Sequence, residues 1–480
     1  MLTATDRFDL LALALDSANG TFIDHVVAPA NLRRALKRVV ANAGAPGTDG
    51  ETVRELAASW PEREGTVRQQ LLDGTYEPAP IRRVPVPKPG GKGPRMLGIP
   101  TVLDRTVQLA IAQPLSALFD PHFSPFSFGF RPGRSAHDAL LQAAQFIEGG
   151  LTWVLHLDLD KFFDRAAHDL VLARLSDQVN SARLLELVRR FLTAPFAQGK
   201  RMLPRSCGLP QGGPLSPLLA NLLLDELDRR ISDAGFAFCR YADDICLFCV
   251  SAARAREAYA TIAPWIEVDL KLVINREKTR IVRAWDDEFL GHEMRCRRGR
   301  IAFRPSATAR LRLRGAVRRL LARHRIHNPG ELIGAALMPL VTGWSLYFRL
   351  CDDSRLFAAI DRWTIKTVRQ WLFQRAQDPR RRARILIKRG VGRDLAWLLV
   401  RKSTPETEAA DCPAVQRAFP VMWLRRHGWN SCCDTPTGAV TSCPEEVRSS
   451  PDSVRLSADL DCCVRSCGLY EWPLRAPMES

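Results

Sequence analysis

Two adjacent carboxylates, Asp243 and Asp244, interrupt an otherwise apolar stretch of the chain. Residues 236–240 form a short apolar-rich run before them, and residues 245–250 form a continuous apolar run after them. Two such runs around a polar pair predict two buried strands joined by a tight turn, so we expect a β-hairpin with the acids at its tip. Because acidic residues at a turn are usually ordinary turn residues, a catalytic interpretation needs another carboxylate from a separate strand.

A third carboxylate, Asp158, ends the apolar run of residues 153–158 and is predicted to lie at the end of a strand. Clustered carboxylates repel one another unless a cation neutralises them, and hard divalent cations prefer oxygen ligands. Three acids from distant strands can hold two Mg²⁺ ions ~3.5–4 Å apart, which activate a 3′-hydroxyl and stabilise the leaving pyrophosphate. Surface acids at strand ends are the alternative for either segment alone, and the complete set favours the metal site.

Beyond these acids, the chain resembles the reverse transcriptase/maturases encoded by bacterial group II introns. The similarity extends from about Asn31 to about Trp429. The segments that carry it are residues 41–50, 86–100, 127–135, 158–164, 208–217, 241–244, 275–279, 289–292 and 343–349. Many segments in the order of the family make the resemblance specific, whereas the tetrapeptide Tyr-Ala-Asp-Asp alone would not.

The resemblance implies a role for each of the three acids. Asp158, Asp243 and Asp244 match the catalytic, metal-binding triad of the family. The backbone carbonyl of Leu159 matches a further metal ligand. The implied cofactor is a pair of Mg²⁺ ions, with Mn²⁺ as a substitute.

The resemblance also implies a nucleotide-binding site. Lys88 and Arg95 match fingers residues that grip the triphosphate, and a guanidinium is suited to bidentate phosphate contacts. Phe163 matches an aromatic residue that crowds the sugar 2′-position and so favours deoxynucleotides, with plain core packing as the alternative. Gln211 matches a support for the incoming nucleotide. Lys278 matches a general acid for pyrophosphate release, with a solvated structural lysine as the alternative.

The implied fold is α+β: a right-hand polymerase with fingers and an antiparallel-sheet palm, followed by a mostly helical thumb/maturase domain. The chain length of 480 residues is suited to this number of domains. The expected boundaries are a lead-in at 1–30, N-terminal extension and fingers at 31–150, palm at 151–285, thumb/maturase RNA-binding domain at 286–430, and a Cys-rich, poorly ordered tail at 431–480.

Positive charge is concentrated in the last third of the sequence. Residues 295–402 contain 27 Lys and Arg against 6 Asp and Glu, a surplus of 21 that exceeds the formal net charge of +17 for the whole chain. Such a surplus predicts binding to a polyanion with strongly salt-dependent affinity. No acid occurs from 295 to 330, so these charges lack partners in their own segment.

Residues 310–325 are predicted to form a helix, because Leu313, Val317, Leu320 and Leu321 share one helical face. Basic residues occupy the other faces, and a second basic cluster follows later in the chain. The RNA-binding residues expected in the two clusters are Arg310, Arg314, Arg318, Arg319, Arg323, Arg381 and Arg382. A solvated basic face is the usual alternative, and membrane binding is disfavoured because no neighbouring segment is long and apolar enough to insert.

The sequence shows no transmembrane segment and no signal peptide, so we expect a cytoplasmic protein with reduced thiols. Among 13 cysteines, Cys246 and Cys249 have Cys-x-x-Cys spacing. Residues three apart in a strand point to opposite faces, so we expect buried apolar side chains there and no shared metal. The six cysteines from Cys432 onward lack such a pair and are weak evidence for zinc.

Together these features predict an RNA-directed DNA polymerase that copies intron RNA and, as a maturase, assists group II intron splicing and mobility. Its expected partners are group II intron RNA, a DNA target or primer and dNTPs, with no membrane and no protein partner. Two alternatives share the scaffold: a non-enzymatic RNA-binding splicing factor, and a domesticated reverse transcriptase in phage defence. The three acids argue against the first, because decay of a polymerase would remove costly clustered carboxylates early.

Overall fold

The computed structural model describes residues 21–87, 94–199, 201–297, 299–323, 329–375, 378–401 and 411–432. These residues form two compact units, which divide between Asp287 and Glu288. Lys88, most of the expected lead-in and the Cys-rich tail from residue 433 lie outside the described residues. The backbones of Arg95 and Arg323 are described, and their side chains are not.

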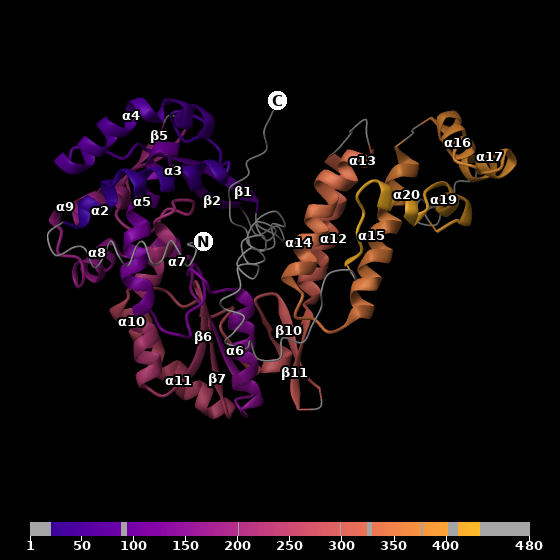
Figure 1. Cartoon of the computed structure of the whole chain (residues 1–480). Helices are drawn as coiled ribbons and strands as arrows, with labels where there is room; N and C mark the ends of the chain where they lie inside the picture. The colour runs from indigo at the N-terminus through magenta and orange to yellow at the C-terminus, as the bar shows by residue number, and fades with distance from the viewer. Residues whose placement is uncertain are drawn as a thin grey trace. The chain divides into compact units, whose positions relative to one another are not determined.

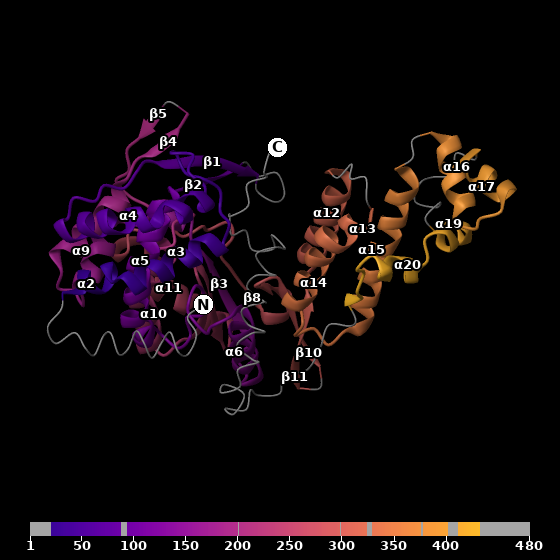
Figure 2. The same ribbon diagram turned by 45° about the horizontal axis from the view of Figure 1, so that its top comes forward.

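A four-stranded antiparallel sheet forms the centre of the first unit, with the strand order β6-β7-β3-β8. The strands are β6 (Ala237–Tyr241), β7 (Asp244–Cys249), β3 (Trp153–Asp158) and β8 (Arg280–Arg283). The helices that pack against them are α6 (Ala136–Glu148), α10 (Ser216–Asp233) and α11 (Ala252–Pro264) (Figure 1, Figure 2).

Both faces of strand β7 are covered. Phe248 packs against Phe146 of α6 with ring centroids 5.5 Å apart, whereas its neighbour Leu247 points to the opposite face and is completely buried. A strand that is buried on both faces has no polar side to alternate with an apolar one. This explains why residues 245–250 are a continuous apolar run.

Helices and a second sheet complete the first unit. This sheet has the order β2-β1-β4-β5, in which β1 and β2 form an antiparallel hairpin. Its strands are β1 (Ile81–Pro87), β2 (Pro94–Ile99), β4 (Phe196–Gln198) and β5 (Arg201–Leu203). The remaining helices are α2 (Phe22–Val27), α3 (Pro29–Ala41), α4 (Val53–Asp73), α5 (Val102–Phe119), η1 (Asp120–His122), α7 (Phe162–Arg165), α8 (His168–Ser176), α9 (Ala182–Thr193), η2 (Trp265–Asp269) and η3 (Ala284–Asp286).

The second unit begins with a small sheet and continues as helices. The sheet has the order β11-β10-β9 and consists of β9 (Glu288–Phe289), β10 (His292–Arg297) and β11 (Arg300–Pro305). The helices are α12 (Ala307–Arg323), α13 (Pro329–Glu331), η4 (Leu332–Leu337), α14 (Met338–Tyr347), α15 (Ser354–Gln374), α16 (Pro379–Lys388), α17 (Arg393–Arg401), α19 (Pro413–Ala418) and α20 (Val421–Arg426). Trp344 and Phe348 lie in its core with ring centroids 4.6 Å apart. The segment 343–349 therefore supplies aromatic packing for this unit.

The α+β architecture confirms the fold class expected from the sequence. The strand at 153–158 and the hairpin around the two acids are also confirmed. One detail differs. Leu320 is only half-buried, because the buried stripe of α12 continues through Leu321.

Candidate active site and basic helices

The two-residue turn Ala242–Asp243 joins β6 to β7, and Tyr241 pairs with Asp244 on either side of it. Ala242 has a φ of 60°, in the left-handed region that tight hairpin turns use at their first central position. Across the sheet, Asp158 is paired directly with Asp244. Residues directly opposite in an antiparallel pair point to the same face, so these two carboxylates lie side by side at the same end of the sheet.

The chemistry of this donor set fits a hard divalent cation. The side chains of Asp158 and Asp244 are 34% and 31% exposed, so each keeps access to solvent while being fixed by a strand. Leu159 pairs with Ile274 in an isolated antiparallel bridge. The hydrogen bonds of this bridge use the carbonyl of Asp158 and the N–H of Asp160, so they do not use the Leu159 carbonyl. Asp243 lies in the turn itself and is half-buried. Oxygen ligands of this kind suit Mg²⁺.

Lys278 lies beside the first of these acids. Its ammonium group donates to both carboxylate oxygens of Asp158, at 3.3 and 3.1 Å. The Lys278 side chain is 59% exposed, and its backbone is held by a turn whose N–H groups bond to Asn275. The structure thus places Lys278 at the acid cluster, where its charge offsets part of the negative charge of Asp158.

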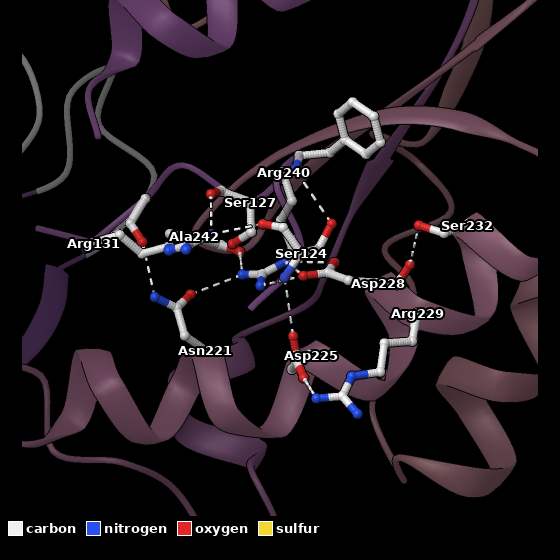
Figure 3. Close-up of polar contacts among 12 residues, drawn as sticks. Ser124, Ser127, Arg131, Asn221, Asp225, Asp228, Arg229, Ser232, Arg240 and Ala242 are labelled. Atoms are coloured by element: carbon white, nitrogen blue, oxygen red, sulfur yellow. Dashed lines mark hydrogen bonds and ion pairs between the residues drawn. The ribbon is translucent and has the colours of Figure 1, made fainter. Parts of the chain in front are cut away.

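A buried ion pair supports the hairpin from below. Arg240 and Asp228 are both fully buried, and Arg240 Nε and Nη2 donate to the Asp228 carboxylate at 2.8 and 2.5 Å. Arg240 Nη1 donates to the Ala242 carbonyl at 3.0 Å and to Asn221 Oδ1 at 2.9 Å, as Figure 3 shows. Burial raises the pKa of Asp228, and Arg240 opposes this shift. The guanidinium therefore links helix α10 directly to the backbone of the turn that carries Asp243.

The segment 127–131 packs against the same turn. A Cβ atom on Gly129 would lie 2.3 Å from the Ala242 nitrogen, so only glycine allows this approach. The Gly129 carbonyl accepts from Asn221 Nδ2 at 2.9 Å, and Arg240 bonds to this segment through its backbone. Asn221 thus connects the glycine, the arginine and helix α10 in one network.

Phe163 lies in α7 next to the loop that carries Gln211. Its ring contacts Phe130 edge-on, with centroids 6.3 Å apart, and its carbonyl accepts from the Leu209 N–H. Phe130 has a φ of 61° and is 38% exposed, an unusual conformation for a bulky residue. Gly208, at a φ of 87°, comes so close to Asp164 that a Cβ would lie 2.8 Å from its carbonyl oxygen.

The same loop reaches the strand of Arg95. The Gln211 carbonyl accepts from the Gly98 N–H in β2 at 3.0 Å. A Cβ on Gly212 would lie 2.4 Å from the Gly98 carbonyl oxygen, so the glycine is required for this contact. Gln211 and β2 are therefore neighbours, which is the arrangement expected of parts of one nucleotide site.

Sequence reasoning missed His156, which lies two residues before Asp158 on the same face of β3. Its Nε2 lies 2.6 Å from Asp244 Oδ1, and its Nδ1 lies 2.8 Å from Asp287 Oδ2. Burial lowers the pKa of His156, but neighbouring Cys246, Asp244 and Asp287 outweigh this effect and raise it above its ordinary value. The period of two in a strand that ends in a candidate catalytic acid could have identified it.

Cys246 and Cys249 are both buried, as expected. Cys246 is nevertheless close to polar groups, because it pairs with His156 across β3 and β7. The ligand atoms of His156, Asp244 and Cys246 lie within 4.8 Å of one another. Burial raises the pKa of the Cys246 thiol to about 11, so this group is neutral at physiological pH.

The arginines of the second unit differ in their contacts and exposure, and Arg314 and Arg318 are exposed although they contact a ring. Arg314 and Arg318 lie over the ring of Trp363 at 5.4 and 5.8 Å, and Arg382 lies over Phe373 at 4.8 Å. Arg319 and Arg381 are exposed. Arg310 is half-buried, with Nε 3.4 Å from the Ser306 carbonyl.

Two family descriptions match the chain in sequence order. Residues 86–294 match "Reverse transcriptase (RNA-dependent DNA polymerase)", and residues 310–390 match "Group II intron, maturase-specific domain". Domains of these two kinds bind nucleic acid, and reverse transcriptases generally use divalent metal ions. None of the helices in the described part of the chain is long and apolar enough to cross a membrane.

The chain is similar to several known proteins. The chain is 31% identical to Protein YkfC of Escherichia coli (strain K12) over 316 residues, 57% of this chain and 83% of that protein. It is 36% identical to the Group II intron-encoded protein LtrA of Lactococcus lactis subsp. cremoris over 179 residues, 37% of this chain and 30% of that protein. The structure of telomerase from Candida albicans aligns at 13% identity and a TM-score of 0.39 over 72% of this chain and 62% of that chain.

The match to LtrA spans less than a third of that protein, whereas the match to YkfC spans most of its length. The two domains follow each other in the order in which the acid cluster and the basic helices occur here. The chain belongs to the family of group II intron-encoded reverse transcriptase/maturases.

Proposed function

We propose that this chain is an RNA-directed DNA polymerase whose acids Asp158, Asp243 and Asp244 hold two Mg²⁺ ions, and that it assists group II intron splicing and mobility. The observation that carries the proposal is the register of the sheet, in which Asp158 lies directly opposite Asp244. This register brings together carboxylates that are 86 positions apart in sequence, at the turn end of the hairpin. An arrangement of structural acids would have no need for a strained turn held by a buried arginine.

The remaining site residues would position the nucleotide and the leaving pyrophosphate, and none of them would form a covalent intermediate with the substrate. The bound ions would supply activation of the primer 3′-hydroxyl and stabilisation of the leaving pyrophosphate. Phe163 forms a wall against the sugar 2′-position, and Phe130 supports its ring from the side. Gln211 supports the nucleotide from a loop fixed to β2. For Lys88 and Arg95, the proposed contact with the triphosphate rests on the family resemblance alone. The Lys278 ammonium lies close enough to the acids to donate a proton to pyrophosphate.

The second unit is proposed to bind the intron RNA. Its helices present arginines without a matching number of acids, and RNA phosphates would neutralise them. Arg314, Arg318, Arg319 and Arg381 are the best candidates because their side chains are exposed. Arg310, Arg323 and Arg382 would extend the same surfaces. The intron RNA would carry out its own splicing chemistry, and the protein would stabilise its shape through backbone contacts.

Primer extension on an RNA template with dNTPs and Mg²⁺ tests the polymerase. We expect DNA synthesis by the wild type and none by the Asp243→Ala/Asp244→Ala variant. The matched control is Asp233→Ala, an exposed acid at the end of α10, which should retain wild-type synthesis. Synthesis that survives the double substitution would refute the assignment of the acids.

A second assay separates the polymerase from the splicing factor. Splicing of a group II intron RNA, supplied from the genomic context of this chain, is measured with the wild type and with the Asp243→Ala/Asp244→Ala variant. We expect both to promote splicing equally, since RNA stabilisation needs no metal site in the protein. Splicing without DNA synthesis by the wild type would favour the non-enzymatic splicing factor. DNA synthesis without any effect on splicing would favour the domesticated reverse transcriptase.

A further inference from the structure

His156 lies between a proposed metal ligand and a second, buried carboxylate. Its Nε2 faces Asp244 Oδ1 at 2.6 Å, and its Nδ1 faces Asp287 Oδ2 at 2.8 Å. Both ring nitrogens therefore face carboxylate oxygens, to which imidazole N–H groups donate, and Nδ1 also lies 3.2 Å from Arg280 Nη2. Only 12% of the His156 side chain is exposed, so water does not compete strongly for these bonds.

The second carboxylate is itself held in place. The Asp287 side chain is 4% exposed and accepts from Arg280 Nε at 2.8 Å and from Arg280 Nη2. Arg280 lies on β8 directly opposite His156 on β3. Burial raises the pKa of Asp287, but the hydrogen bond from His156 and the charges of His156 and Arg280 lower it overall. A continuous chain of bonds thus runs from Arg280 through Asp287 and His156 to Asp244.

We propose that His156 is a positioning residue for nucleotidyl transfer, which holds the Asp244 carboxylate in the orientation that binds the divalent cation. The proposal rests on the polymerase function proposed above. The hydrogen bond engages Oδ1 of Asp244 and stops rotation of the carboxylate, which leaves Oδ2 as the oxygen directed to the cation. Asp287 fixes the ring of His156 in turn, as a second carboxylate fixes a histidine at many metal sites.

This arrangement differs from simple core packing in what it controls. A buried histidine that only fills space would affect folding and leave the affinity for the cation unchanged. A residue that orients a ligand changes that affinity, typically by about 10- to 100-fold when it is removed. Cation affinity is therefore the measurement that distinguishes the two roles.

The test uses the full chain bound to a primer–template and measures Mn²⁺ binding by electron paramagnetic resonance, without nucleotide and without turnover. His156→Leu removes both N–H groups at similar volume, and His156→Gln keeps an amide N–H near the position of Nε2. We expect His156→Leu to weaken Mn²⁺ binding by about 10- to 100-fold and to raise the Mg²⁺ concentration for half-maximal synthesis in parallel. His156→Gln should recover most of both losses.

Two further variants keep the test decisive. Asp287→Asn preserves the shape of the side chain and weakens its hold on Nδ1, so it should reduce Mn²⁺ affinity less than His156→Leu does. His137→Leu removes another buried histidine of the first unit, in α6, and should leave Mn²⁺ affinity unchanged. If His156→Leu folds and binds Mn²⁺ like the wild type, or if Asp287→Asn does so when His156→Leu does not fold, the positioning role is refuted. Absence of DNA synthesis by the wild type would refute the polymerase, whereas its Mn²⁺ binding would still test His156.

Discussion

The two units of this chain use arginine in opposite ways. In the first unit, Arg240 is fully buried and bonded to Asp228, and Arg280 is bonded to a buried Asp287. In the second unit, arginines such as Arg319 and Arg381 extend from helices into solvent. Such arginines with fixed partners, Arg240 in the interior and Arg280 with 41% of its side chain exposed, determine the position of a few backbone and carboxylate atoms. Exposed arginines without acids determine affinity for a polyanion and place few demands on geometry.

This difference follows from what each task requires. Metal-assisted phosphoryl transfer depends on placing the reacting groups closely, and a small displacement is costly. A rigid pair of charges in the interior supplies that placement, although desolvation of both ions makes it a poor source of net stability. Binding a long RNA backbone tolerates variation in each contact, because the free energy is shared among many phosphates. The second unit accordingly has an excess of positive charge, although several of its arginines contact aromatic rings.

Removing one member of the buried pair should have the largest effect. Asp228→Ala leaves the guanidinium of Arg240 without its partner in the interior, which costs about 3–5 kcal/mol of folding free energy. That is a large part of the total stability of a typical domain. Chemical denaturation followed by circular dichroism should show the transition of the first unit at lower denaturant concentration. An unchanged transition would contradict a structural role for the pair.

The double variant Asp228→Leu/Arg240→Met separates stability from geometry. Replacing both ions by apolar residues of similar volume is often neutral or stabilising, so most of the lost stability should return. DNA synthesis should remain low, because the Ala242 carbonyl and Asn221 still lack the donor that held them. Wild-type synthesis by a stable double variant would show that the arginine has no part in holding the catalytic turn.

The sequence was sufficient for the strands that carry the acids and insufficient for the network that holds them. The runs around Asp243 and at 153–158 specify strands by their period and length, and the structure contains both. Arg240 interrupts an apolar strand, and Asp228 interrupts the apolar helix before it. Opposite charges within two buried elements were a usable signal for an internal pair. Their pairing depends on how α10 packs on the sheet, which no local pattern specifies.

The arginines of the second unit also show that local sequence patterns do not specify contacts between distant elements. Helical periodicity identified the buried residues of α12, such as Leu313 and Val317. It could not show that Arg314 and Arg318 cover the ring of Trp363, because this aromatic residue comes from α15, far along the chain. A surplus of positive charge therefore predicts RNA binding by a region. It does not predict which arginines of that region also have contacts inside the protein.

The next prediction concerns the proposed nucleotide site, where Phe163 would discriminate against ribonucleotides by a steric clash and not by charge. Phe163→Val removes most of the wall against the 2′-hydroxyl, so incorporation of ribonucleotides relative to deoxynucleotides should rise by about tenfold or more, as a loss of a steric contact worth about 1–3 kcal/mol would produce. Phe130→Leu should have a smaller effect in the same direction, since it removes the lateral support of that ring. Single-nucleotide incorporation kinetics with dNTPs and rNTPs measure both changes. Unchanged discrimination in Phe163→Val would favour plain core packing.

RNA binding should depend on exposed arginines with little effect on folding. Arg319→Gln/Arg381→Gln removes two side chains that are exposed in the second unit. If each contacts one phosphate, the slope of log affinity against log salt should become shallower by about 1.4–1.8. Filter binding of intron RNA at several salt concentrations gives this slope, and thermal unfolding should be unchanged. An unaltered slope would exclude these two arginines from the RNA surface.

The smallest expected effect is a loss of stability on removing the two arginines that contact Trp363. It would show that some arginines of the second unit also have an internal role. Arg314 and Arg318 lie over Trp363, a contact worth about 0.5–1 kcal/mol at an exposed site, so they have an internal partner although they carry no ion pair there. Arg314→Gln/Arg318→Gln should therefore lower the stability of the second unit by about 1 kcal/mol. The matched variant Arg312→Gln/Arg319→Gln changes two exposed arginines of the same helix and should leave stability unchanged. Denaturant titration measures the difference in stability between the two variants, and salt-dependent RNA binding measures the loss of phosphate contacts.

If the two variants lose RNA affinity equally and only the first loses stability, arginines of this helix combine packing with RNA binding. Equal stability of both variants would show that the contact of Arg314 and Arg318 with Trp363 does not stabilise the second unit.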